Sequence, residues 1–345
     1  MNHKILMMMF LISAGCCSFT AIVGWEKGGS PPSKNNTVAI QTAVSKGFSL
    51  LQTSGARMIE KVRCASCHHT AMTSLIAATM EEKGITGIDT TAGLRENAMV
   101  GTLDYVGNPN LNHQFVSAKF LAPYILLGLH AEKHPADFNT DLAVNYIISQ
   151  ALPDGSFKAE YARVPLECGD IHLTAMAIRA LDLYASKAKR IQVQQLLLHS
   201  KTWMEQQTPT TQQELSFQLM GMNWCGSNQS AKNAVLKKLF SLQNKDGGWS
   251  QLPSMTSDAY ATGQVLYAMS QTGMSTTESQ PFQAGTDYLL RTQDKTGAWI
   301  MVTRSNPIQP FVNTDFPPYD DNQFISAAGT NWAVLALATS LPDKK

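Results

Sequence analysis

The chain has 345 residues, with 27 Lys and Arg against 26 Asp and Glu, so its formal net charge at pH 7 is +1. A nearly neutral chain lacks the excess of basic residues that is typical of nucleic-acid-binding proteins, and no run of basic residues predicts binding to an anionic membrane. Hydrophobic residues make up 44% of the sequence, which is enough for a large core. We therefore expect a soluble body without a nucleic-acid partner.

Residues 1–24 predict an export signal. Lys4 is the only charged side chain before Glu26, and the apolar run that follows it ends in small residues, as in secretory signal peptides. Cys16 leaves a lipoprotein anchor open, and residues 5–24 are long enough for an uncleaved membrane anchor. Each alternative places the rest of the chain outside the cytoplasm, in the periplasm or at the outer surface, with membrane contact only through the N-terminus.

The remainder divides into a linker and one domain. Residues 25–38 are rich in Gly, Pro, Ser and Asn, a composition that predicts a disordered linker. In residues 39–345 apolar side chains recur at helical spacing, and no hairpin signal joins alternating segments. We therefore expect an all-α domain over residues 39–345.

Two short patterns repeat along this domain. The turn Gln-Asn-Lys-Asp-Gly-Gly-Trp at 243–249 recurs at 293–299 and, degenerately, at 150–157. Its Gly can take the left-handed conformation that ends a helix, and its aromatic ring can cover the exposed helix end. The second pattern opens a helix with a capping residue and places Thr one turn further on. Its copies lie at 66–71, 170–175, 258–263 and 326–331.

Such repeats indicate helix pairs that stack as an open solenoid or close into a ring. Gln-x-x-x-Gly-x-Trp turns with capped helices carrying Thr-Ala resemble the squalene–hopene cyclase and prenyltransferase superfamily. More narrowly, the chain is similar to exported bacterial squalene-cyclase-like repeat proteins with a Cys-x-x-Cys-His-His sequence. The matching stretches are 64–69, 164–181, 246–269 and 320–337. The resemblance implies an α/α toroid whose inner helices line a mostly apolar cavity, suited to a hydrophobic small molecule, and it implies no particular activity.

The sequence Cys64-Ala-Ser-Cys67-His68 is the attachment pattern of a c-type haem. Two thiols bind the haem vinyl groups, and the adjacent imidazole takes one axial position on iron. A local disulfide or free thiol pair is the first alternative. A zinc site that includes His69 is the second, although no further ligands follow nearby.

The second axial ligand is open. Alignment of the repeats puts His172 at the position of His68, so both should face the same rim of the ring, and His172 is our first choice. His113, His130, His134 and the Met residues compete. A histidine bonded to backbone at a helix start is the structural alternative for His172.

Squalene–hopene cyclases protonate an alkene with an Asp-x-Asp-Asp-Thr-Ala motif, which needs an unusually strong acid. The two equivalent positions here keep only the first carboxylate, at Asp170 and Asp258, and carry His172 and Tyr260 where the donor would lie. A lone Asp at a helix start is held ionised by backbone N–H groups. We therefore expect these carboxylates to cap helices or line the cavity, and this departure argues against terpene cyclisation.

Further polar residues lie in segments between helices. Arg163, Glu167, Arg304 and Asp321 are candidates for binding or acid–base chemistry at the rim, and loop ion pairs or turn caps are the alternative. In an oxidising compartment Cys168 and Cys225 could form a disulfide, or remain two buried thiols.

These observations lead to three hypotheses. The first is an exported redox protein with a covalent haem and a redox protein partner. The second is a non-redox module that binds a hydrophobic ligand or a protein, and the third is a hydrolase, lyase or cyclase acting on a lipid or glycan.

Overall fold

The computed structural model describes residues 34–63, 65–106, 118–159, 163–274, 279–305 and 312–344. These residues form the following helices: α1 (Lys34–Val62), η1 (Cys67–Ala71), α2 (Met72–Lys83), α3 (Ala92–Val106), α4 (Ala118–Ala131), α5 (Phe138–Ser149), α6 (Asp170–Tyr184), α7 (Arg190–Gln206), α8 (Gln212–Trp224), α9 (Gln229–Ser241), α10 (Ala259–Ser270), α11 (Gln280–Thr292) and α12 (Gln323–Thr339). In this part of the chain two isolated bridges are the only β-structure. The predicted all-α class is confirmed.

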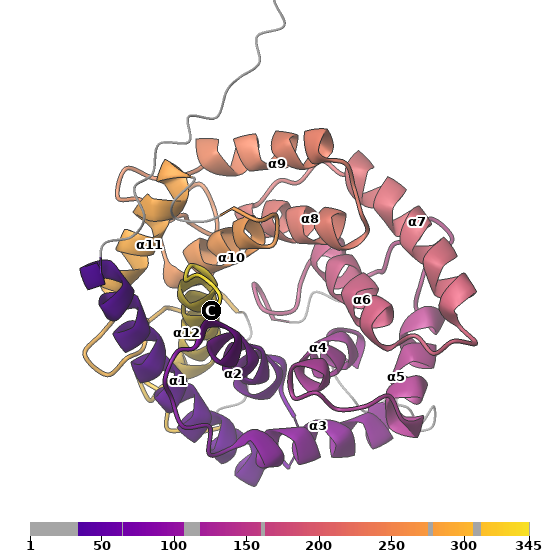
Figure 1. The fold of residues 1–345 in the computed structure, drawn as a ribbon, viewed down its shortest axis with the longest axis horizontal. Helices are drawn as coiled ribbons and strands as arrows, with labels where there is room; N and C mark the ends of the chain where they lie inside the picture. Colours follow the sequence, from indigo (N-terminus) through magenta and orange to yellow (C-terminus); the bar gives the residue numbers. More distant parts are fainter. Residues whose placement is uncertain are drawn as a thin grey trace, which may run out of the picture.

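The helices alternate between an outer and an inner ring (Figure 1). The odd-numbered helices form the outer ring, and the even-numbered helices surround the centre. The last inner helix, α12, packs against both α1 and α2, so the ring is closed and the predicted α/α toroid is confirmed. None of the described helices is long and apolar enough to span a bilayer.

Sequence and position agree in both rings. The inner helix α12 is apolar nearly all round and is buried from Ile325 to Ala338, as expected for a helix covered on every side. The outer helix α9 buries only Val235, Leu236 and Leu239 and turns its Lys-rich face to solvent. The predicted boundary at residue 38 differs from the structure. Helix α1 already begins at Lys34, within the segment predicted as a linker, because a helix that tertiary packing stabilises can extend into residues of weak helix propensity.

The repeated turns connect the two rings. Gly247 has φ +88°, and a Cβ there would lie 2.6 Å from the carbonyl O of Ala284 in α11, so both conformation and space require glycine. The indole Nε1 of Trp249 donates to the carbonyl O of Leu239 at 2.7 Å. The ring therefore covers the end of its own outer helix, as predicted.

The Thr of the second repeat fastens each turn to the following inner helix. The backbone N–H of Trp249 donates to Oγ1 of Thr262 at 2.9 Å. The same bond joins Trp299 to Thr330 at 3.0 Å, and Phe157 to Thr174 at 3.0 Å. Thr at this position thus supplies a buried acceptor that the turn needs.

The helix-start prediction holds for two of its four copies. Ser66 and Asp258 are N-caps whose side chains accept backbone N–H groups. Asp170 is instead the first residue of α6, after Gly169. Ser326 lies inside α12, where its Oγ accepts the backbone N–H of Met301 at 3.0 Å. Both were predicted as caps, and both act on a neighbouring segment instead.

Candidate functional site

The Cys-His-His turn lies at the start of the inner helix α2. Ser66 caps the turn by accepting the N–H of His69 at 3.0 Å, and Cys67, His68 and His69 are all buried. Cys64, the first residue of the pattern, lies outside the described residues, as do residues 1–33 with the predicted export signal. The turn contacts α1, α4 and α12, so its side chains enter the ring rather than solvent.

His68 and His69 each bury an Nε2 that has no hydrogen-bond partner within the described part of the chain. The carbonyl O of His68 accepts Nδ2 of Asn331 at 2.5 Å. Burial, followed by the nearby His172, His69 and Arg163, lowers the pKa of His68 to about 3. His68 is therefore a neutral imidazole with an unused ring nitrogen.

Tyr124 links His68 to His172. The Tyr124 ring centroid lies 5.6 Å from that of His68, and its hydroxyl lies 2.9 Å from Nε2 of His172. The Nδ1 of His172 lies 3.3 Å from the carbonyl O of Cys168. A carbonyl only accepts, so Nδ1 carries the proton and Nε2 accepts the hydroxyl of Tyr124.

His172 is thus buried and engaged at both nitrogens. Phe217 stacks on it with ring centroids 3.8 Å apart, and burial lowers its pKa to about 3. Tyr124 contacts both His172 and His68, which the repeat alignment had put at equivalent positions. The structure does not offer His172 as a free ligand, because its Nε2 holds Tyr124. The alternative that we gave for it, a backbone-bonded histidine at a helix start, matches the contact to Cys168.

The other histidines named as axial candidates lie elsewhere. His130 is exposed near the end of α4, with its ring edge against Tyr184. His134 lies between Glu96 and Asp137, with its ring nitrogens 2.8 Å and 3.2 Å from the two carboxylates. His113 lies outside the described residues.

The chemistry of Cys67 is that of a protonated thiol. Burial is the main cause that raises the pKa of this thiol, and the negative charge of Glu167 raises it further. No group of three or more His, Cys, Asp or Glu within the described ranges could hold a metal ion. That search does not include Cys64. The surroundings suit neither a thiolate nucleophile nor a zinc site built from the described residues.

The segment before α6 covers this end of the ring. In Figure 1 it reaches inward from α6 toward the centre. The carbonyl O of Pro165 accepts Nε2 of Gln213 in α8 at 3.0 Å and the hydroxyl of Tyr260 in α10 at 3.4 Å. Nε of Arg163 and Oε2 of Glu167 are 2.9 Å apart. Two of our rim candidates, Arg163 and Glu167, therefore meet in this segment, which their ion pair and the buried Tyr260 of α10 stabilise.

Asp258 is the most perturbed carboxylate of the site. Its Oδ1 accepts the N–H of Ala261 at 2.8 Å, and its Oδ2 accepts Nε2 of Gln251 at 3.1 Å. Nε of Arg304 donates to Oε1 of Gln251 at 2.8 Å. Burial raises the pKa of Asp258 to about 6 despite these bonds. The sequence predicted that Asp258 caps its helix and stays ionised. The cap is confirmed, but burial raises the pKa of Asp258 more than its hydrogen bonds to backbone N–H groups lower it.

Asp170 and Asp321 have simpler roles. The carboxylate of Asp170 accepts the N–H of Ala159 at 2.9 Å and pairs with Nζ of Lys158 at 2.7 Å, so it ties down the segment before α6. Asp321 is exposed in the turn before α12. Neither carboxylate is hydrogen-bonded to His68, Tyr124 or His172 in the described structure.

Cys168 and Cys225 are free thiols. The Sγ of Cys168 lies 3.7 Å from Nε2 of Gln213 in the first turn of α8, whereas Cys225 follows the last residue of this 13-residue helix. A helix of that length spans about 20 Å, and disulfides need Cα atoms within about 7 Å. The suggested pairing is therefore excluded by the length of α8.

The sequence argument missed three central residues. Tyr124 lies in α4. No copy of either repeat was recognised in this helix, so the sequence could not show which of its residues face the inside of the ring. Asn331 is the last residue of the repeat copy at 326–331 and Trp332 follows it, yet the sequence could not distinguish a site role from ordinary core packing for either residue. The Oδ1 of Asn331 and the Nε1 of Trp332 are buried without a partner in the described structure. A buried polar atom without a partner is the feature that marks these two residues, and only the three-dimensional structure shows it.

Comparisons with known proteins bear on the fold. No protein-family model matches the sequence, and no curated protein matches it. Among solved structures, the apo type II terpene cyclase MstE from Scytonema aligns with a TM-score of 0.60 at 14% identity, covering 87% of this chain and 98% of that chain. A variant of MstE with its substrate geranylgeranyl dihydroxybenzoate aligns with a TM-score of 0.57 at 14% identity, over 89% and 98% of the two chains. The chain thus has the squalene-cyclase-like α/α toroid fold of a type II terpene cyclase.

Proposed function

We propose that this chain is an exported haem protein in which Cys64 and Cys67 bind a c-type haem and His68 is an axial ligand. The observation that carries the proposal is the buried Nε2 of His68, which has no partner in the described structure. Iron binds the neutral form of imidazole, and the lowered pKa of His68 keeps this form at neutral pH. Cys67 begins the same turn, which is the order that thioether attachment needs.

The residues around His68 fit such a group in their donor chemistry. A bound haem would supply one-electron transfer, and a redox protein partner would exchange those electrons. Asn331 holds the backbone of His68 through its carbonyl and thereby fixes the orientation of the turn. Burial keeps the thiol of Cys67 protonated, which disfavours metal binding through its thiolate. His172 keeps its bond to Tyr124, so the proposal leaves the second axial position to another group.

Intact mass tests the proposal. We expect the full chain, exported from a host with a cytochrome c maturation system, to be red and heavier by one haem. Cys67→Ser should lose the covalent mass, and the matched control Cys168→Ser should keep it. His68→Ala should keep the covalent mass and change the visible spectrum. Colourless protein with unmodified thiols, a Cys64–Cys67 disulfide, or stoichiometric zinc in elemental analysis would each refute the haem. The same mass spectrum reports signal cleavage and lipidation.

Asp258 favours a second candidate, an acid–base enzyme for an apolar ligand inside the ring. A carboxyl group with a pKa near 6 is partly protonated at neutral pH, which suits general acid catalysis. It is a weaker acid than an ordinary aspartic acid, so it favours lipid hydrolysis or elimination over alkene protonation. The substrate of MstE, geranylgeranyl dihydroxybenzoate, is a suitable first probe because it combines an apolar chain with a polar head.

Asparagine caps helices as well as aspartate does, so Asp258→Asn separates chemistry from capping. We expect the wild-type chain to convert the probe and Asp258→Asn to lose conversion at an unchanged melting temperature. Asp170→Asn serves as the control and should remain active. Equal conversion by wild type and Asp258→Asn, or no conversion by either, removes this candidate for the probe class.

A further inference from the structure

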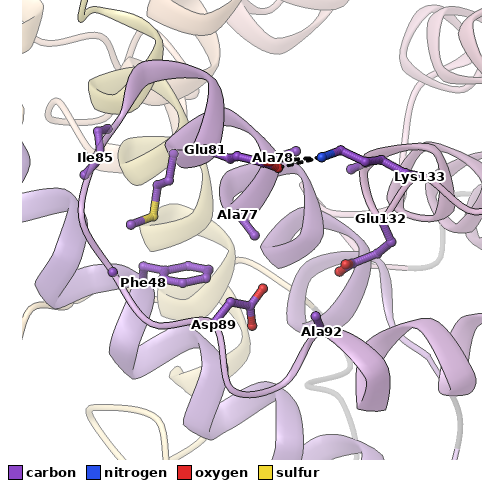
Figure 2. Close-up of a pocket in the computed structure, with 12 residues that line it drawn as sticks. Phe48, Ala77, Ala78, Glu81, Ile85, Asp89, Ala92, Glu132 and Lys133 are labelled. Carbon is purple, nitrogen blue, oxygen red and sulfur yellow. Dashed lines mark hydrogen bonds and ion pairs between the residues drawn. The ribbon is translucent and has the colours of Figure 1, made fainter. Parts of the chain in front are cut away.

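A separate cavity lies between α1, α2, α3 and the end of α4, at the other end of α2 from the Cys-His-His turn. Its volume is about 410 Å³, a size suited to a small organic molecule. Its apolar lining comes from Phe48, Ala77, Met80, Ile85 and Ala92. In Figure 2 the carboxylate of Asp89 lies beside the Phe48 ring, and the carboxylate of Glu132 lies across from it.

The charges in the wall of this cavity do not cancel. Arg95, only 1% exposed, lies behind the two carboxylates. Its Nη1 and Nη2 donate to the two oxygens of Asp89 at 2.9 and 2.6 Å. Its Nε and Nη2 donate to Oε1 of Glu132 at 3.0 and 2.6 Å. One guanidinium thus faces two carboxylates, which leaves one negative charge at the cavity.

The remaining charge has a free acceptor. Both contacts of Arg95 to Glu132 use Oε1, and no donor in the described residues reaches Oε2. The Glu132 side chain is 11% exposed, and its carboxylate points into the cavity toward Asp89 in Figure 2. At the rim, Glu81 and Lys133 pair with each other at 2.9 Å, so Lys133 does not neutralise Glu132. The partial exposure leaves Oε2 open to solvent, and an ammonium that replaces water there gains a charge-assisted hydrogen bond to the carboxylate.

We propose that this cavity binds a small organic cation, a primary ammonium group on an apolar body. The ammonium donates to Oε2 of Glu132 and compensates the uncancelled charge. The hydrocarbon part packs against Phe48, Met80 and Ile85, where burial of apolar surface adds affinity. An anion would meet the two carboxylates, and a neutral alcohol would gain the packing without the charge-assisted bond. The site is independent of the haem proposal.

Titration calorimetry on the full chain with three matched probes tests this selectivity. The probes are 2-phenylethylammonium, 2-phenylethanol and 3-phenylpropionate, which share a ring and differ in head group. We expect the ammonium to bind about tenfold tighter than the alcohol, because a charge-assisted hydrogen bond is worth that much or more. The carboxylate should not bind measurably. Ammonium and alcohol of equal affinity would overturn the proposal.

Two variants locate the site. Glu132→Gln keeps an oxygen for Arg95 and removes the charge, so the preference for the ammonium should fall to about twofold or less. The control Glu205→Gln, at an exposed position of α7 away from the cavity, should keep the preference. Ala77→Leu fills the cavity without changing a charge and should weaken both the ammonium and the alcohol at least about tenfold. If Glu132→Gln does not fold, Ala77→Leu alone decides. An unchanged ammonium affinity in either folded variant refutes the site.

Discussion

The side-chain amide of Gln293 donates to the backbone carbonyl O of Ala43 at 2.9 Å, across 250 positions of sequence. The same Nε2 also lies 2.9 Å from the carbonyl O of Gly297 in its own turn. Gln243 makes the equivalent pair of bonds one repeat earlier, to Gly247 and Pro281. The first residue of the Gln-x-x-x-Gly-x-Trp turn therefore binds the next outer helix, and the last copy closes the ring onto α1.

Removal of this amide should loosen the closure. We expect Gln293→Ala to lower the free energy of unfolding by about 1–2 kcal/mol, because two backbone acceptors lose their shared donor. Urea denaturation measures the loss. Gln192→Ala, at an exposed position of α7, is the control and should change stability by no more than about 0.5 kcal/mol. Equal effects of the two changes would show that Gln293 does not stabilise the closure.

The Thr of the second repeat gives a second prediction. Thr262→Val keeps the shape of the side chain and removes the acceptor for the N–H of Trp249. A buried N–H without a partner should cost about 1–3 kcal/mol, measured by thermal or urea unfolding. Thr202→Val at an exposed site of α7 controls for the substitution itself. Full stability of Thr262→Val would contradict the role of this threonine as the fastener between rings.

The Tyr124–His172 bond predicts a third result. Tyr124→Phe leaves Nε2 of His172 buried without a donor, so unfolding should become easier by about 1–3 kcal/mol. The exposed Tyr319 provides the control, since Tyr319→Phe removes a hydroxyl that water already satisfies. NMR of the ring nitrogens should show Nδ1 as the protonated nitrogen of His172 in wild type. Protonation at Nε2 would reverse the donor and acceptor roles assigned to this pair.

His134 predicts a pH dependence of stability. Burial alone would lower its pKa, but the hydrogen bonds that its ring donates to Glu96 and Asp137, and the negative charges of these two carboxylates, raise it on balance. Because the folded protein holds this proton more tightly than the unfolded chain, the stabilisation is complete below the unfolded pKa of about 6.5 and is lost as pH rises through the folded value. The difference in unfolding free energy between wild type and His134→Gln should therefore be larger at about pH 6 than at about pH 8.5. A difference that grows with pH would have the wrong sign for this site. Taking the difference cancels the contribution of the buried histidines, whose pKa values are lowered.

Local sequence was enough for the helices, their turns and the repeat. The caps at Ser66 and Asp258 and the threonine of each inner helix depend on hydrogen bonds within one repeat. The glycines of the QxxxGxW turns follow from the left-handed backbone conformation, whereas the Gln of each turn also binds the next outer helix. Closure of the ring was predicted through a resemblance, and the packing of α12 against α1 confirms it. The second repeat predicted N-caps at Asp170 and Ser326, and this was wrong. The motif places its residues on the helix face that contacts the preceding turn, and it does not fix where the helix begins.

Tertiary structure alone decided which groups meet inside the ring. Tyr124 and His172 are 48 positions apart, and Arg95 of α3 reaches Oε1 of Glu132 across 37 positions. Sequence spacing places a residue on a helix face, but it does not set the rotation of that helix against its neighbours. Rotation is fixed by packing of whole helix faces around the ring. Burial then sets the pKa of His68 and of Asp258, which cap and motif rules cannot supply.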